Sequence, residues 1–279
     1  MLDTLALQVG SSPYTWQWEH LWVPALLAGI YLACAGPLRG RFPGSAPVAR
    51  VRAQLFMSGV LLLFVAVVSP IETLSGYLLS VHMVQHLTLT MLVAPLLLVG
   101  TPGWMLRPLL RPRFAWPVAR ALTQPVAAFL LFNAIFSVWH VPALYDLALR
   151  DGTTHALEHA LFLPAALLTW WPVFSQLDEL PRLADPPLLL YLFFESLPPT
   201  ILGALITFAG GPLYPSYAAA PRLWGLSVAI DQQLGGLIMW FPGALVYFAV
   251  LTVVFFRWLN RDEHEQSQDT RRVALEIRD

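Results

Sequence analysis

The sequence predicts an all-α, polytopic membrane protein with seven transmembrane helices, its N-terminus outside and its C-terminus in the cytoplasm. The first observation is composition, because 57% of the 279 residues are hydrophobic and only 12% are charged. The second is a mean hydropathy of +0.62, which lies outside the range of soluble globular domains. The third is the distribution of arginines along the chain, which sets the orientation.

Seven apolar stretches are each about 20 residues long, the length that crosses a hydrocarbon core. Prolines inside these stretches predict kinks, because proline removes a backbone donor. The sixth stretch contains ESLPPT and is expected to be bent or broken there, with Glu195 either capping the freed backbone or relaying protons. The stretches are expected at residues 20–37, 54–74, 79–100, 124–142, 153–174, 187–210 and 231–257.

A single transmembrane domain is expected over residues 1–259, followed by a polar cytoplasmic tail over residues 260–279. Cys34 is the only cysteine, so the sequence offers no intramolecular disulfide and no cysteine-based metal motif. The net charge is −1, and no run of basic residues occurs. The expected surroundings are therefore the lipid bilayer, with no nucleic-acid partner.

The basic residues are concentrated on one side of the predicted bundle. All 16 are arginines, and all but Arg150 and Arg222 follow the first, third, fifth or seventh apolar stretch. The positive-inside rule places those segments in the cytoplasm. The N-terminus is therefore expected outside, and seven spans bring the C-terminus to the cytoplasmic side.

Under this topology, six of the seven histidines fall at the outer ends of the spans. Four of them form two pairs with i, i+4 spacing, His82 with His86 in VHMVQH and His155 with His159 in THALEH. This spacing places two imidazoles on one helix face, where they can chelate a metal ion. Histidines are rare within membranes because an unpaired polar group is costly in hydrocarbon.

Two more polar residues are expected at the same depth: His140 at the end of the fourth span and Asp231 at the start of the seventh. Glu158 would be a carboxylate ligand or the acceptor that orients an imidazole. His20 would either join the site or belong to an interfacial belt. The alternatives to a metal are a protonatable polar network and bis-histidine haem ligation. The predicted metal ligands are His82, His86, His140, His155, His159 and Asp231.

Imidazole with occasional carboxylate suits copper, zinc or iron, and the absence of thiolates argues against iron–sulfur chemistry. Copper is the first choice at the outer face of a bacterial-type membrane, with zinc, iron and haem as alternatives. Met83 and Met239 would either add thioether contacts that favour Cu(I) or simply pack. An iron-dependent membrane hydroxylase would need more histidines, presented toward the cytoplasm.

Four motifs together resemble the CtaG-type cytochrome c oxidase assembly factors of bacteria, which are associated with caa3-type oxidases. The likeness runs from about the second span to the seventh. It implies a multi-pass protein of the bacterial inner (plasma) membrane that is not an enzyme, and it implies the same six functional residues. Gln232, Trp139 and Trp240 match motif positions and would support the site. The motifs are HMVQHLTLTMLVAPLLLVGTP, WHVPALYDLAL, HALEHALFLPAALLTWWPV and DQQLGGLIMWFPG.

The expected function is therefore assembly of a haem–copper cytochrome c oxidase. The protein would hold copper at the outer membrane face and pass it to an oxidase subunit by ligand exchange. The alternatives are a bis-histidine haem protein that transfers electrons and an assembly scaffold that binds no metal.

Overall fold

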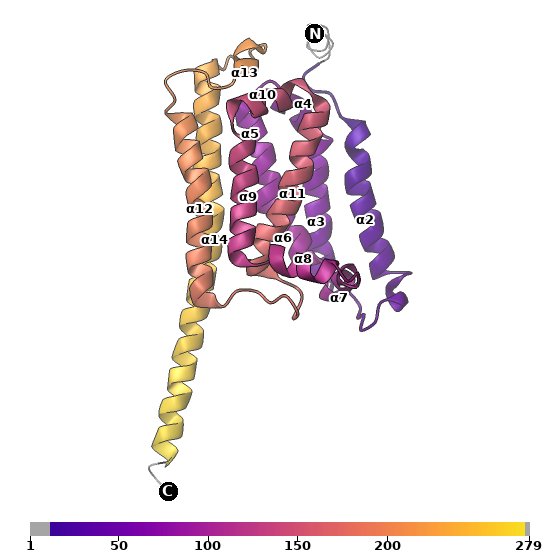
Figure 1. The fold of residues 1–279 in the computed structure, drawn as a ribbon, viewed down its shortest axis with the longest axis vertical. Helices are drawn as coiled ribbons and strands as arrows, with labels where there is room; N and C mark the ends of the chain where they lie inside the picture. Colours follow the sequence, from indigo (N-terminus) through magenta and orange to yellow (C-terminus); the bar gives the residue numbers. More distant parts are fainter. Residues whose placement is uncertain (1–11, 277–279) are drawn as a thin grey trace.

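The computed structural model describes residues 12–276, with side chains described as far as Glu263. Every regular element in these residues is helical, and the long helices lie side by side in one bundle (Figure 1). They are α2 (Trp22–Ala35), α3 (Arg50–Val67), α5 (Leu79–Leu87), η3 (Thr88–Val93), α6 (Ala94–Gly100), α9 (Pro125–Trp139), α11 (Gly152–Phe174), α12 (Asp185–Thr207) and α14 (Val228–Glu276).

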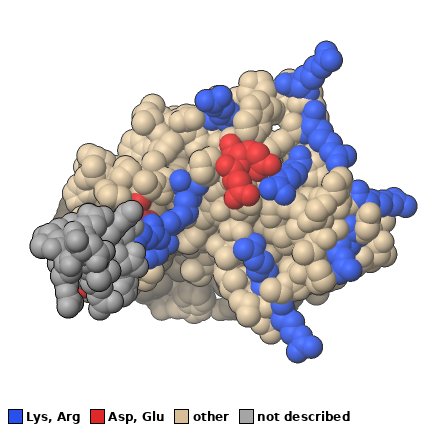
Figure 2. Space-filling model, turned by 90° about the horizontal axis from the view of Figure 1, so that it is seen from below, with Lys and Arg blue, Asp and Glu red and all other residues tan. Residues whose placement is uncertain are grey.

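Short elements cover the two ends of the bundle. At the end shown uppermost in Figure 1 lie α4 (Pro70–Ser75), α10 (Pro142–Arg150) and α13 (Pro215–Ala219). We call this the α10 end. The opposite end carries η2 (Arg39–Arg41), α7 (Gly103–Leu106), η4 (Arg107–Leu110) and α8 (Ala115–Leu122). Figure 2 views this opposite end and shows arginine side chains spread across it, the arrangement on which the predicted orientation depends.

The all-α, polytopic class is confirmed. Six helices of the described residues are long and apolar enough to cross a membrane. A seventh span is present if the bent pair α8 and α9, which meet at 77°, is counted as one crossing. The helix η1 (Trp18–Leu21) extends α2, while α5, η3 and α6 form one continuous span.

Two expected spans that contain proline differ in the structure: the second ends earlier, and the sixth, which was expected to be bent or broken, has no break. The second span does not reach residue 74, because α3 ends at Val67 and α4 begins separately at Pro70. Proline is well tolerated at the first position of a helix, and the Ser69 hydroxyl there accepts a hydrogen bond from the Ile71 amide. The sixth span is not broken, because α12 continues through Pro198 and Pro199.

Glycine allows α12 and α14 to pack in direct backbone contact. A Cβ atom built on Gly236 would lie only 2.7 Å from the Gly203 carbonyl oxygen, so neither position has room for a side chain. Close helix packing through small residues is typical of membrane bundles. Beyond the bundle α14 continues as one helix as far as Glu276, so the expected boundary after residue 259 falls inside a helix.

Candidate metal centre

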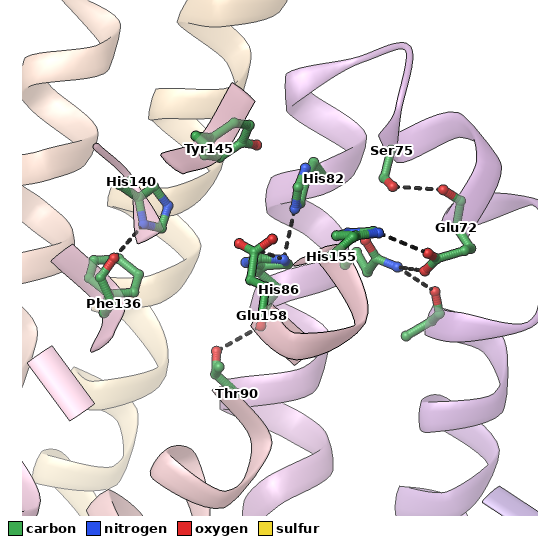
Figure 3. Close-up of polar contacts among 12 residues, drawn as sticks. Glu72, Ser75, His82, His86, Thr90, Phe136, His140, Tyr145, His155 and Glu158 are labelled. Carbon is green, nitrogen blue, oxygen red and sulfur yellow. Dashed lines mark hydrogen bonds and ion pairs between the residues drawn. The ribbon is translucent and has the colours of Figure 1, made fainter. Parts of the chain in front are cut away.

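The two histidine pairs lie on neighbouring faces of α5 and α11. The ring centroids of His82 and His155 are 5.4 Å apart, and those of His86 and His159 are also 5.4 Å apart. The pairs are therefore in register, with His82 beside His155 and His86 beside His159 one turn further along. Figure 3 shows His82, His86 and His155 of this cluster. His82 and His86 are buried, while His155 and His159 are half-buried.

Helix starts fix this register. The Asp151 carboxylate accepts a hydrogen bond from the Thr154 amide at 2.8 Å and so caps the N-terminus of α11. His155 lies in the first turn of this helix. The start of α5 is held by a carboxylate from another helix. Asp231 accepts from the amides of Leu79 and Ser80, at 2.8 and 3.1 Å.

One group of possible ligands combines both helices. His82, His86, His155 and Glu158 each offer a ligand atom, and these atoms lie within 4.8 Å of one another. The Nε2 atoms of His82 and His86 are 2.7 Å apart, and Glu158 Oε1 lies 3.6 Å from His86 Nε2. Two ligands of a tetrahedral ion with bonds of about 2.1 Å would be about 3.4 Å apart. Small side-chain shifts would therefore let these four atoms surround one ion.

The carboxylate in this group lacks hydrogen-bond donors. Glu158 is 1% exposed, and neither of its oxygen atoms has a hydrogen-bond partner among the described residues. A buried carboxylate without donors is costly unless a positive charge compensates it. The donor set and this unpartnered acid both fit a bound cation.

A tyrosine outside the group sets the tautomer of His82. The Tyr217 hydroxyl donates to the Ser75 carbonyl at 2.7 Å, so it can only accept from His82 Nδ1, which lies 2.9 Å away. The proton of His82 is therefore on Nδ1, and its Nε2 presents a lone pair toward His86. Partners of this kind orient the imidazoles of metal sites.

A second group joins the first through His155. Glu72, His155 and His159 offer ligand atoms within 4.8 Å of one another. His155 Nδ1 lies 3.1 Å from Glu72 Oε1, and Gln85 Nε2 donates to the other oxygen of Glu72. Burial raises the pKa of Glu72, but the hydrogen bond from His155 and the charges of nearby histidines outweigh it and lower the pKa to about 2.

Glu72 is the site residue that the sequence analysis missed. It lies on α4, the short helix that connects α3 and α5. The sequence indicates its role only weakly. Glu72 is an acidic residue two positions after Pro70 and ten before His82, at the predicted outer end of the bundle. The position becomes a neighbour of His155 only in the folded bundle, where α4 packs against α5 and the Glu72 side chain reaches His155 of α11.

The structure does not bring every predicted ligand together. His140 ends α9, where its Nδ1 donates to the Phe136 carbonyl at 2.7 Å, and it belongs to neither group. The oxygens of Asp231 accept hydrogen bonds at the start of α5. His20 Nδ1 lies 3.1 Å from the Val67 carbonyl oxygen.

Two other polar residues of interest hold helices together. The Gln232 side-chain oxygen accepts from the Leu213 amide at 2.8 Å. Glu195 is fully buried in α12, where it accepts from Asn133 of α9 and from Thr169 of α11. It bridges three helices instead of capping the backbone near Pro198 and Pro199.

Comparison with known proteins finds one family and several relatives. The sequence model of a family described as "Cytochrome c oxidase caa3 assembly factor" matches residues 29–261. Uncharacterized proteins of Mycobacterium bovis and Mycobacterium tuberculosis are each 28% identical over 95% of the chain, and one of Mycobacterium leprae is 26% identical over 92%. The chain spans 42% of the length of the first two and 41% of the third. No solved structure matches.

Proposed function

Because the chain belongs to the cytochrome c oxidase caa3 assembly factor family, we propose that it supplies copper to an oxidase subunit from the cluster on α5 and α11. The observation that carries this proposal is the convergence of three imidazoles and one carboxylate without hydrogen-bond donors, whose ligand atoms lie within 4.8 Å of one another. In this proposal copper is cargo, and its transfer is an exchange of ligands.

The charge of the cluster suits a copper ion. The Glu158 carboxylate would compensate a buried positive charge, while neutral imidazoles donate lone pairs without adding charge. His82 is already held in the required tautomer by Tyr217. The 2.7 Å contact between His82 and His86 is a hydrogen bond in which one nitrogen carries the proton. An incoming ion would bind both Nε2 atoms, and neutral His86 would then carry its proton on Nδ1, which has no hydrogen-bond partner among the described residues.

The location of the cluster suits a carrier. His155 is in the first turn of α11, and both His155 and His159 are partly exposed at the α10 end. In our proposal this end faces outward, because the arginine-rich end would be cytoplasmic. A donor or acceptor protein could then reach the ion without crossing the hydrocarbon core.

The packing of the rings favours single ions over haem. Across α5 and α11, ring centroids are 5.4 Å apart both between His82 and His155 and between His86 and His159. Bis-histidine haem requires two imidazoles on opposite sides of a flat macrocycle. These rings contact each other directly, so a porphyrin would have to separate α5 from α11.

The test replaces His82 and His86 together by alanine in the full chain, with His264→Ala in the helical tail as the matched control. We expect the double variant to lose bound copper, measured by elemental mass spectrometry, and to lose oxidase assembly in cells. The control should retain both. Normal copper content and normal assembly in a correctly folded double variant would overturn the proposal, and assembly by a metal-free wild type would favour a scaffold.

A further inference from the structure

A small cavity lies deeper in the bundle than the histidine cluster, among α5, η3, α9, α11, α12 and α14. Its volume is about 20 Å³, which holds one water molecule or one ion. Three methionine side chains line it together with two imidazoles. These residues are Met83, Met91, Met239, His86 and His140.

The His140 imidazole has a nitrogen atom with a free lone pair, which could bind a metal ion. The Nδ1 of His140 donates to the Phe136 carbonyl, so in the neutral ring Nε2 carries a lone pair. This Nε2 is buried and has no partner among the described residues, and the same is true of His86 Nδ1. His140 is only 4% exposed, so the free lone pair is out of reach of bulk solvent.

The methionines match this free imidazole chemically. Met83 and Met239 come from different helices and are 1% and 2% exposed, while Met91 comes from the π-helical turn η3. Thioether sulfur is a soft ligand that selects Cu(I) and similar ions. A water molecule needs two to four polar partners, which thioethers supply poorly.

The residues that line the cavity favour an ion of low charge. No carboxylate lines it, in contrast to the cluster that contains Glu158. A divalent ion would carry two uncompensated charges into a largely apolar space, and a monovalent ion carries one. The lining therefore favours a soft monovalent cation.

The backbone around the cavity is also unusual. A π-helical turn begins two residues after His86, and such turns inside longer helices are frequent at functional sites. The carbonyl of Thr90 in this turn accepts from the Trp170 indole at 2.8 Å, which holds the irregular segment in place. The wider turn carries Met91 beside the cavity.

We propose that this cavity is a second metal site, in which His140 and the methionines Met83 and Met239 bind a soft monovalent cation such as Cu(I). His86 lines both this cavity and the cluster, so an ion could pass from one site to the other across a single side chain. The proposal rests on the proposed function only for the identity of the natural ion as copper.

The test uses Ag(I), a redox-inert substitute for Cu(I), titrated into the detergent-purified full chain. The variant Met83→Leu/Met239→Leu keeps side-chain volume but removes both sulfurs. The matched control is Met57→Leu/Met105→Leu, which changes two methionines packed at another core cluster. We expect the first variant to bind one silver ion fewer than the wild type, and the control to bind as many as the wild type.

Two further measurements separate this site from the first. His155→Ala/Glu158→Gln should retain the silver ion that the methionine variant loses, and His140→Gln should weaken its binding. X-ray absorption of the silver-loaded wild type should show sulfur ligands. Equal silver binding by the wild type and the Met83→Leu/Met239→Leu variant would overturn the second site, whatever the fate of the proposed copper delivery.

Discussion

The Nε2 atoms of His82 and His86 lie 2.7 Å apart across one turn of α5, and Glu158 from α11 lies beside them. This contact places two ligand atoms closer together than a metal ion would hold them. The two nitrogens are therefore joined by a hydrogen bond, and a slight separation would let them hold an ion between them. The residues that orient these two imidazoles, compensate the charge of an ion or hold the surrounding helices lead to four predictions.

Tyr217 should control the affinity of the cluster. Tyr217→Phe removes the acceptor that holds His82 in its tautomer, and we expect copper affinity to fall about 10- to 100-fold. Competition with a chelator of known affinity measures this. Tyr247→Phe is the matched control, because the Tyr247 hydroxyl is buried without a partner among the described residues. Equal loss in both variants would contradict an orienting role for Tyr217.

Glu158 should lower the stability of the metal-free protein. Glu158→Gln removes a buried carboxylate without donors, so we expect a higher melting midpoint in detergent and loss of copper. Glu179→Gln is the control, because that side chain is in an exposed pair with Arg107, and such pairs contribute little. A lower midpoint in Glu158→Gln would show that the carboxylate is stabilising without an ion.

Asp231 should matter to folding more than to metal binding. Asp231→Ala removes the acceptor for the first amides of α5, and we expect a loss of about 1 kcal/mol in stability. Copper bound per folded protein should be unchanged. If Asp231→Ala and the conservative Asp231→Asn both fold but bind no copper, then Asp231 is a ligand, as the sequence alone suggested.

Glu72 should make stability depend on pH in the acid range. Its native pKa is about 2, below the ordinary value of 4.5. The stabilisation is therefore fully present above pH 4.5 and is lost as the pH falls toward 2. Melting midpoints of the metal-free protein should fall over this interval, and Glu72→Gln should flatten the fall. An unchanged profile in Glu72→Gln, matching the exposed control Asp178→Asn, would contradict the pairing of Glu72 with His155.

The span positions could be predicted because each depends on local composition. Apolar length identified the helices, and the i, i+4 spacing correctly placed each histidine pair on one face. The sequence placed the two pairs at the same depth on the third and fifth spans, and the structure brings them together on α5 and α11.

The remaining features depend on contacts between elements that are distant in the chain. Glu72 reaches His155 across the bundle from α4, which packs against α5, and no spacing rule connects those positions. Asp231 begins its own helix, yet its carboxylate serves the first amides of another. Pro198 and Pro199 remain within one helix, although proline rules alone predicted a bend or a break there.

The most direct measurement is copper X-ray absorption spectroscopy on the Met83→Leu/Met239→Leu variant, which lacks the thioethers of the second site. The account predicts bound copper with imidazole nitrogen and carboxylate oxygen ligands and no sulfur, a signal that disappears when His82 and His86 are also replaced by alanine. A variant that folds and retains no copper, or one whose copper signal survives that replacement, would contradict the central claim.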